Sequence, residues 1–350
     1  MRGSIRLFKV FDISINIHAT FFLLILLFLT GGLKWIVVML GVFFFVTVHE
    51  LCHSLVARAF GIKVREITLL PIGGVASMTK LPEKPLHEFL ISIAGPLSNI
   101  AVVLIFFYPV KYIIGEEALF HPLSTATWPL TVAYIYWINI VLAGFNLIPA
   151  FPMDGGRMLR AVLAAKLGYQ RATRFAATLG HIFAIVFAYF GIVRFNLIMI
   201  AIAIFIYMAA SSEEVQVDIK ETLKKFKVRD ILPHDFYTLT ADTVLSKALE
   251  LVFRSHQEDF PVLDGKELAG FVTRQDMMSG VHRFGTDVLI RDIMRKEFPK
   301  AKETDSLVMV QNLMQENEMA AMPVMRGDDV IGIVTIEDIG RVYAMISQKG

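Results

Sequence analysis

Two histidines and a glutamate with the spacing of a metal site lie in one long apolar run. His49, Glu50 and His53 occur in the segment VTVHELCHSLVARAF. Side chains four residues apart lie on one face of an α-helix, so both imidazoles could bind the same metal ion. Glu50 stands beside them and could take a proton from water at the metal. The three residues therefore predict a zinc protease site within a membrane; the simpler alternative is polar side chains that pair with each other or with backbone.

A catalytic zinc site needs a third protein ligand, and Asp154 is the best candidate. It lies eight residues after Asn146 in the segment GFNLIPAFPMDGGR. The prolines and glycines of this segment prevent a regular helix, and irregular backbone at membrane depth is tolerated only against protein or a wet cavity. For an isolated Asp-Gly pair, an ordinary cytoplasmic turn would be the better interpretation. Together with the histidine pair, the segment favours Asp154 as a ligand.

The composition is that of an integral membrane protein with a different, soluble tail. Of the 350 residues, 55% are apolar and 19% are charged. Through Ser212 there are 16 basic and 8 acidic residues, and the remainder has 18 and 24. The net charge of +2 gives no reason to expect nucleic acid binding. Long apolar runs predict about six transmembrane helices, near 15–31, 35–57, 88–110, 130–148, 176–193 and 195–211.

The distribution of basic residues predicts the orientation of the chain in the membrane. With the amino terminus in the cytoplasm, the basic residues left outside are Lys34, Lys111 and Arg194. The acidic tail is then cytoplasmic too. His49 would lie roughly two-thirds of the way along its helix, at about 1.5 Å per residue, toward the cytoplasmic end. Because hydrolysis requires water, the helices should enclose a polar cavity open to that side.

Two further segments are expected to pack near the site. The run EITLLPIGGVASMTK at 66–80 predicts a β-hairpin, broken at Gly73 and Gly74, that dips into the membrane. Such a hairpin could receive substrate as an added strand, or it could only pack on the helices. In the segment IAGPLSN, Asn99 could bond a buried carbonyl or water in the cavity; the interpretation we favour is close helix packing at Gly95 with a locally satisfied amide at Asn99.

The tail contains an internal duplication with a constant offset of 62 residues. Each copy alternates amphipathic helical runs with short strands and is therefore a small α/β unit. The pattern resembles tandem cystathionine-β-synthase (CBS) domains. The landmarks of the two copies are Arg229-Asp230, Pro261-Val262, Gly270, Thr273 and Asp276, and Arg291-Asp292, Pro323-Val324, Gly332, Thr335 and Asp338.

The membrane part resembles the site-2 protease family of intramembrane metalloproteases. The family's His-Glu-x-x-His and its later Asn-x-x-Pro with Asp-Gly are both present, about one hundred residues apart. The resemblance implies one zinc ion on His49, His53 and Asp154, with Glu50 activating water. Asn146 would hold substrate or support the oxyanion, or it would only cap its helix. The chain looks closest to archaeal and bacterial members with six spans and a carboxy-terminal CBS pair.

The resemblance of the tail to CBS domains implies a nucleotide site. Each copy carries Thr-x-x-Asp, as Thr273 with Asp276 and Thr335 with Asp338. Members with this motif commonly bind adenine nucleotides (ATP, ADP or AMP), with Asp on the ribose hydroxyls and Thr near phosphate. The alternative is helix capping, since Thr or Asp before a helix satisfies free N–H groups in many proteins. A homodimer through the CBS domains is a further expectation of the resemblance.

The expected fold is an α-helical polytopic membrane domain with a membrane-associated β-hairpin, followed by an α/β tandem CBS module. The expected function is zinc-dependent cleavage of transmembrane segments in single-span proteins of the cell membrane, controlled by adenine nucleotides. A CBS-regulated transporter or channel, and a noncatalytic receptor with structural zinc, are the alternatives. Both leave Glu50 without a clear role. The expected boundaries are 1–212 for the protease domain, 213–227 for a linker, and 228–286 and 287–350 for the CBS domains.

Overall fold

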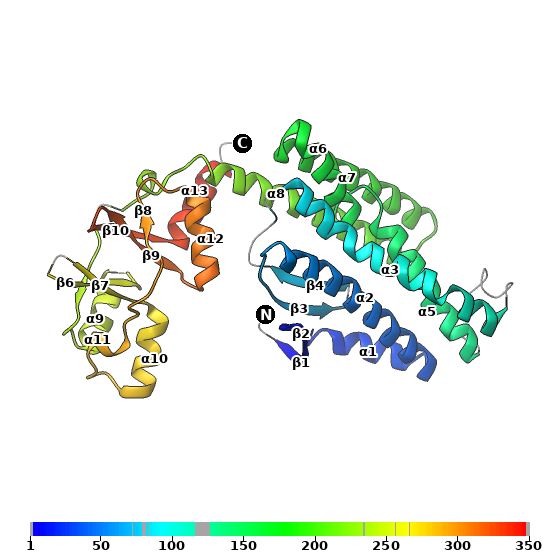
Figure 1. Ribbon diagram of the computed structural model, residues 1–350, viewed down its shortest axis with the longest axis horizontal. Coiled ribbons are helices and arrows are strands. Elements are labelled where there is room, and N and C mark those ends of the chain that lie inside the picture. Colours follow the sequence, from blue (N-terminus) through cyan, green and yellow to red (C-terminus); the bar gives the residue numbers. More distant parts are fainter. Residues whose placement is uncertain are drawn as a thin grey trace. The chain divides into compact units, whose positions relative to one another are not determined.

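The computed structural model divides the chain into two compact units, Met1–Val217 and Asp218–Gly350 (Figure 1). Each unit is described by itself. Residues that the structure describes are 3–71, 73–78, 82, 84–115, 127–233, 235–255, 257–265 and 267–347.

Long apolar helices dominate the first unit. Their outer faces are apolar and exposed, as at Leu104, Ile185 and Ile198, which suits contact with lipid acyl chains. These helices pack side by side, with α3 in contact with both α2 and α5 (Figure 1). Among the described residues, five helices are long and apolar enough to cross a membrane: α2 (Leu33–Ala59), α3 (Pro85–Ile114), α5 (Trp128–Asn146), α7 (Tyr169–Val193) and α8 (Leu197–Leu223).

The apolar run expected to form the first span is not one long helix. It divides into strand β2 (Ile13–His18) and helix α1 (Phe21–Leu29). The nine residues of α1 extend only about 14 Å, whereas the hydrocarbon core is about 30 Å thick. The alternation of ISINIH, which buries Ile13 and Ile15, is the period-two pattern of a strand. Average hydropathy hid this pattern, and among the described residues the other five expected spans are the ones present as membrane-length helices.

The hairpin expected at 66–80 is present and belongs to a larger sheet. Strands β3 (Val64–Leu70) and β4 (Gly73–Met78) pair antiparallel, while residues 72, 79 and 80 lie outside the described part. Strand β1 (Ser4–Val10) extends the sheet, whose order is β1-β2-β3-β4. The buried side of the sheet packs on α2. Strand β4 is last in the strand order and is therefore an edge strand, and it also contacts α2.

An irregular segment follows α5 and leads into the amphipathic helix α6 (Asp154–Leu167). It carries a cis peptide bond between Phe151 and Pro152. Helix α6 packs against α3 and α7. Gly155 permits close approach of the two backbones, because a Cβ there would lie 2.3 Å from the carbonyl oxygen of Ile148. The first residue of α6 is therefore brought back against the membrane helices.

The second unit holds two α/β repeats with equivalent strand pairings. In each sheet the outer short strand pairs in parallel with the middle strand, which pairs antiparallel with the third. The register Leu239↔Val262 recurs as Ala301↔Val324, which is the offset of 62. The first repeat contains η1 (Val228–Asp230), β5 (Leu239–Thr240), α9 (Leu245–Ser255), β6 (Phe260–Asp264), β7 (Glu267–Val272) and α10 (Arg274–Phe284). The second contains α11 (Ile290–Ile293), β8 (Ala301–Lys302), α12 (Leu307–Asn317), β9 (Ala321–Arg326), β10 (Asp329–Thr335) and α13 (Ile336–Ser347).

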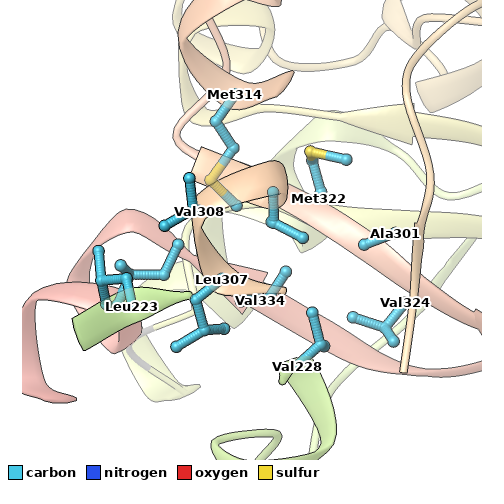
Figure 2. Packing of buried hydrophobic residues seen from close by; sticks show 11 residues of the cluster. Leu223, Val228, Ala301, Leu307, Val308, Met314, Met322, Val324 and Val334 are labelled. Carbon is cyan, nitrogen blue, oxygen red and sulfur yellow. The ribbon is translucent and has the colours of Figure 1, made fainter. Parts of the chain in front are cut away.

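Helix α8 runs through most of the segment expected to be a linker and ends in the core of the second repeat. Leu223, its last residue, is 1% exposed and packs with Leu307 and Val334 (Figure 2). The backbone N–H of Val228 donates to the carbonyl oxygen of Asp305, which joins the chain after α8 to the second repeat. The helix that ends the membrane domain is thus also part of the tail's core.

Candidate metal centre

The histidine pair on α2 is buried and converges as its spacing predicts. His49 is 4% exposed and His53 is 6% exposed. Their rings meet edge to face, with centroids 4.7 Å apart, and their Nε2 atoms are 3.1 Å apart. Such proximity of two ring nitrogens needs a proton or a cation between them, because two lone pairs repel each other.

Asp154 completes a cluster of three ligand atoms. Its Oδ2 lies 3.0 Å from Nε2 of His49 and 3.1 Å from Nε2 of His53. Among the described residues, these three side chains form the group of His, Cys, Asp or Glu that could hold a metal ion. The structure therefore brings the three expected ligands together from two helices about one hundred residues apart.

Hydrogen bonds on the far side of each imidazole decide which nitrogen is free. Nδ1 of His53 lies 2.6 Å from the carbonyl oxygen of Ile91, and Nδ1 of His49 lies 2.5 Å from Oδ1 of Asn99. Because these oxygens accept, each Nδ1 carries the proton and donates it. With Nδ1 as the donor, the lone pair of Nε2 in each neutral imidazole would point into the cluster, which is the tautomer of a metal ligand.

Asn99 is in turn oriented by a second amide. Its Nδ2 donates to Oδ1 of Asn139 at 2.9 Å, and Nδ2 of Asn139 donates to the carbonyl oxygen of Ile135 at 3.0 Å. This chain of bonds turns the Asn99 oxygen toward His49. The sequence favoured a packing role with a locally satisfied amide; the Asn99 amide is satisfied, but by His49 and Asn139 on other helices rather than locally. The signal available was a polar side chain one helical turn after Gly95, in the helix next to the histidines.

The cluster suits zinc in the type of its donor atoms, in the distances between these atoms, and in the room beside them. Two imidazoles and a carboxylate form a common ligand set for catalytic zinc, with Zn–N of about 2.0–2.1 Å. Tetrahedral geometry at that bond length separates ligand atoms by about 3.3 Å, close to the distances here. The space beside the cluster is kept by Gly95, where a Cβ would lie 2.2 Å from Nε2 of His53. The close packing expected at Gly95 is thus present, and the groups packed against this glycine are the two imidazoles of the candidate metal site.

Glu50 is half-buried and lies against the edge strand of the sheet. A Cβ on Gly74, in β4, would lie 2.6 Å from Cγ of Glu50. Within the part of the chain that the structure describes, no hydrogen bond engages the Glu50 carboxylate. The carboxylate is therefore available to accept a proton from water beside the cluster.

Asn146 is half-buried at the last position of α5. No hydrogen bond of its side chain is present among the described residues, so a capping bond does not hold it. Its expected role with substrate stays a prediction. Among the described residues, the ligand cluster does not include Cys52.

The two Thr-x-x-Asp motifs of the tail both form capping boxes. Thr273 Oγ1 donates to Oδ2 of Asp276 at 2.6 Å, and Thr335 Oγ1 donates to Oδ2 of Asp338 at 2.7 Å. The backbone N–H of each Asp donates to the Thr hydroxyl oxygen, as in the capping interpretation.

Each of these Asp carboxylates is also held by an arginine. Arg295 contacts both oxygens of Asp276, with Nε at 2.8 Å and Nη2 at 3.0 Å, and this bond raises the pKa of Arg295. Arg341 donates to Oδ1 of Asp338, but its side chain is 69% exposed. The expected nucleotide residues are thus present in both copies, and the carboxylate of the first copy is the more firmly engaged.

Comparison with known proteins agrees with both parts of the chain. The profile of peptidase family M50 matches residues 37–127 and 109–188, and that of the CBS domain matches 228–283 and 290–344. A zinc metalloprotease from Methanocaldococcus jannaschii is 33% identical over 358 residues, which covers 100% of this chain and 98% of that protein.

Solved structures resemble each part separately. The site-2 protease from Methanocaldococcus jannaschii is 38% identical, with 60% of this chain and 95% of that chain covered and a TM-score of 0.48. A CBS domain pair solved with 5′-methylthioadenosine and S-adenosyl-L-methionine is 24% identical, with 35% and 98% covered and a TM-score of 0.32. Since the identity to the full-length relative extends over both chains, this chain belongs to peptidase family M50, the zinc metalloproteases of the site-2 type, and carries a tandem pair of CBS domains.

Proposed function

We propose that this metalloprotease cleaves peptide bonds inside transmembrane segments of single-span membrane proteins. The observation that carries the proposal is the convergence of three potential ligand atoms, on His49, His53 and Asp154, among helices long enough to cross a membrane. A transporter or a receptor leaves the carboxylate of Glu50 beside these ligands without a clear role. Proteolysis uses it as a base.

In the proposed mechanism one zinc ion is held by His49, His53 and Asp154. Zinc supplies a Lewis acid that polarises the peptide carbonyl and makes water more acidic. Glu50 accepts a proton from the attacking water and returns it to the leaving amide nitrogen. Asn146 would hold the substrate backbone or the developing oxyanion.

Substrate access is proposed to use the edge of the four-stranded sheet. A transmembrane helix must unwind before its peptide bonds can reach the metal, and an unwound segment leaves backbone hydrogen bonds to be satisfied. Strand β4 pairs with β3 along one edge and can offer the other to an added strand. Because Gly74 of β4 contacts Glu50, a strand added there would enter beside the proposed base.

Replacing Glu50 by Gln tests the proposed chemistry. The substitution removes the base and keeps the size of the side chain, so the variant should bind one zinc ion and cleave nothing. Cleavage of a single-span substrate by detergent-purified protein, with zinc content measured on the same samples, gives both readouts. A zinc chelator should abolish cleavage by the unsubstituted protein, and added zinc should restore it. A Glu50→Gln variant that cleaves at the original rate would refute the assignment.

We further propose that adenine nucleotides bind the CBS pair and change the access of substrate. The proposal is supported by a Thr and an Asp at the start of a helix in both copies, whose hydroxyl and N–H groups now pair within the capping boxes and could turn to phosphate when these open. The Asp oxygens could accept from ribose hydroxyls once the arginines release them. Helix α8, whose last residue Leu223 lies in the tail's core, is the covalent connection to the membrane domain.

Adding ATP, ADP or AMP to the full-length protein tests this regulation. Binding is measured by calorimetry, and cleavage by initial rates over a range of substrate concentrations. Control of access predicts a changed KM with kcat preserved. Arg295→Ala should tighten nucleotide binding, because it frees the Asp276 carboxylate. Measured binding of nucleotide with no change in cleavage would reject the regulatory proposal and leave the protease assignment intact.

Orientation and assembly are proposals that rest on the charge distribution and the CBS pair. The amino terminus and the tail are placed in the cytoplasm, and the CBS domains are expected to form a homodimer. Protease accessibility of the tail in sealed vesicles tests the first. The mass of the detergent-solubilised protein, measured by light scattering, tests the second.

A further inference from the structure

A buried cluster of charged side chains joins helix α6 to two membrane helices. Arg160 is 1% exposed, and its Nε donates to Oε1 of Glu88, in the first turn of α3, at 2.7 Å. Its Nη1 donates to Oε2 of Glu213, on α8, at 3.2 Å. Arg157 contacts the other oxygen of Glu213 at 2.9 Å. The chemistry proposed above uses none of these four side chains.

Arg160 also holds the irregular segment that precedes Asp154. The guanidinium carbon lies 4.8 Å from the ring centroids of both Phe151 and Tyr169. Phe151 is fully buried, and its backbone N–H donates to the carbonyl oxygen of Ala176, on α7, at 3.2 Å. One side chain therefore contacts the chain on both sides of the third proposed ligand.

The position of Asp154 follows from these anchors. It is the first residue of α6, and Arg157 and Arg160 lie about 4.5 and 9 Å further along the helix at about 1.5 Å per residue. Anchoring a stiff helix at two points fixes its first residue. The contact of Gly155 with the backbone of Ile148 leaves no space for the first turn to move inward.

The cluster is poorly suited to a purely stabilising role. A buried ion pair is seldom more stable than apolar side chains of the same size. Two of its buried polar atoms, Oε2 of Glu88 and Nε of Arg157, have no hydrogen-bond partner among the described residues, and neither has Oη of Tyr169 beside Arg160. Buried groups left unsatisfied cost stability, so a geometric function accounts better for the arrangement.

We propose that Arg160, held by Glu88 and Glu213, is a positioning residue that sets the Asp154 carboxylate at the metal site. The consequence for proteolysis rests on the function proposed above, whereas the consequence for metal binding does not. Groups that orient metal ligands are typically worth about 10–100-fold in metal affinity or activity.

The test compares full-length protein with Arg160→Gln, Arg160→Lys and Glu213→Gln. Zinc affinity is measured by competition with a chromophoric chelator, the ligand geometry by the visible spectrum of the Co²⁺-loaded protein, and cleavage by kcat and KM. Arg160→Gln should lower zinc affinity by about 10–100-fold and change the Co²⁺ spectrum, with kcat reduced and KM retained. Arg160→Lys keeps the charge and should restore part of the affinity.

Glu214→Gln is the matched control. Glu214 lies next to Glu213 on α8, but its carboxylate pairs with Arg174 on α7 at 3.6 Å and is 33% exposed. It should leave zinc affinity, spectrum and kcat unchanged. If Arg160→Gln fails to fold, judged by circular dichroism and gel filtration, Glu213→Gln decides the question.

Several outcomes would overturn the proposal. A folded Arg160→Gln or Glu213→Gln variant with unaltered zinc affinity and Co²⁺ spectrum would show that the cluster only stabilises the fold. A raised KM with unaltered kcat would assign it to substrate binding instead. Because metal binding is measured without a substrate, absence of proteolysis in every sample would count against the proposed function while the zinc data still decide this inference.

Discussion

Gly95→Ala should disable the metal site while it leaves the helix intact. A Cβ at this position would lie 2.2 Å from Nε2 of His53 and 2.6 Å from Nε2 of His49. Ordinary contact begins at 3.4 Å, so the methyl group overlaps the nearer nitrogen by about 1.2 Å. Zinc sites tolerate changes in ligand distance of only about 0.2 Å. We therefore expect zinc affinity to fall at least about 100-fold, which is about 2.8 kcal/mol at 1.4 kcal/mol per tenfold.

Zinc affinity measured by chelator competition gives the magnitude, and helical content measured by circular dichroism reports the fold. Ala is a better helix former than Gly by up to about 1 kcal/mol, which opposes any general loss of structure. Gly144→Ala on α5 is the control, because nothing lies within 4 Å of a Cβ there, and it should bind zinc normally. A folded Gly95→Ala variant that binds zinc as tightly as the unsubstituted protein would refute the geometry described for the site.

Three further predictions follow from other contacts. Asn99→Leu removes the acceptor that orients His49 and should lower zinc affinity about 10–100-fold by chelator competition; unchanged affinity would contradict the assigned tautomer. Gly74→Val pushes against Glu50 and should reduce kcat more than tenfold with zinc content retained, whereas equal loss of zinc would assign the contact to the metal site instead. Burial raises the pKa of the Asp259 carboxyl above 3.8, because the ionised form is poorly solvated there. The stability that the neutral carboxyl contributes in acid is therefore lost as pH rises through its folded-state pKa. Asp259→Asn should therefore slow amide exchange in β6 relative to the unsubstituted protein at pH 7, with the difference vanishing below about pH 4; a difference that persists in acid would contradict this cause.

The ligands could be identified from sequence because their chemistry is local. The spacing of His49 and His53 fixes their common helix face, and Glu50 lies between them in the chain. Asp154 needed a further argument, that irregular backbone among membrane helices must face protein or a cavity. The structure brings the three expected ligand atoms within reach of one ion, and their role as ligands stays a proposal for experiment.

The contacts that support the ligands depend on how the helices pack. The bond from His49 to Asn99 joins α2 to α3, and the bonds of Arg160 join α6 to α3 and α8. A single sequence gives the spacing within each helix but not the rotation of one helix against another. Asn99 was therefore interpreted as a packing residue, and Arg160 was not singled out.

The amino-terminal segment shows a different limit. Residues 15–31 are apolar enough on average to suggest a span. The start of this run belongs to strand β2, in which Ile13 and Ile15 alternate with polar residues and pair in a sheet. A partner strand, β3, lies about fifty residues later in the chain. Hairpin formation by β3 and β4 was predictable from local sequence, whereas the addition of β1 and β2 depends on pairing between distant segments.

The position of the cut in a membrane-embedded substrate tests the central claim most directly. Full-length protein and its Glu50→Gln variant are reconstituted in liposomes with a single-span substrate in H₂¹⁸O, and the products are identified by mass spectrometry. We expect a cut within the apolar segment, one ¹⁸O atom in the new carboxyl terminus, and no product from the variant. Cuts confined to the segments outside the membrane, or equal cleavage by both proteins, would contradict the claim.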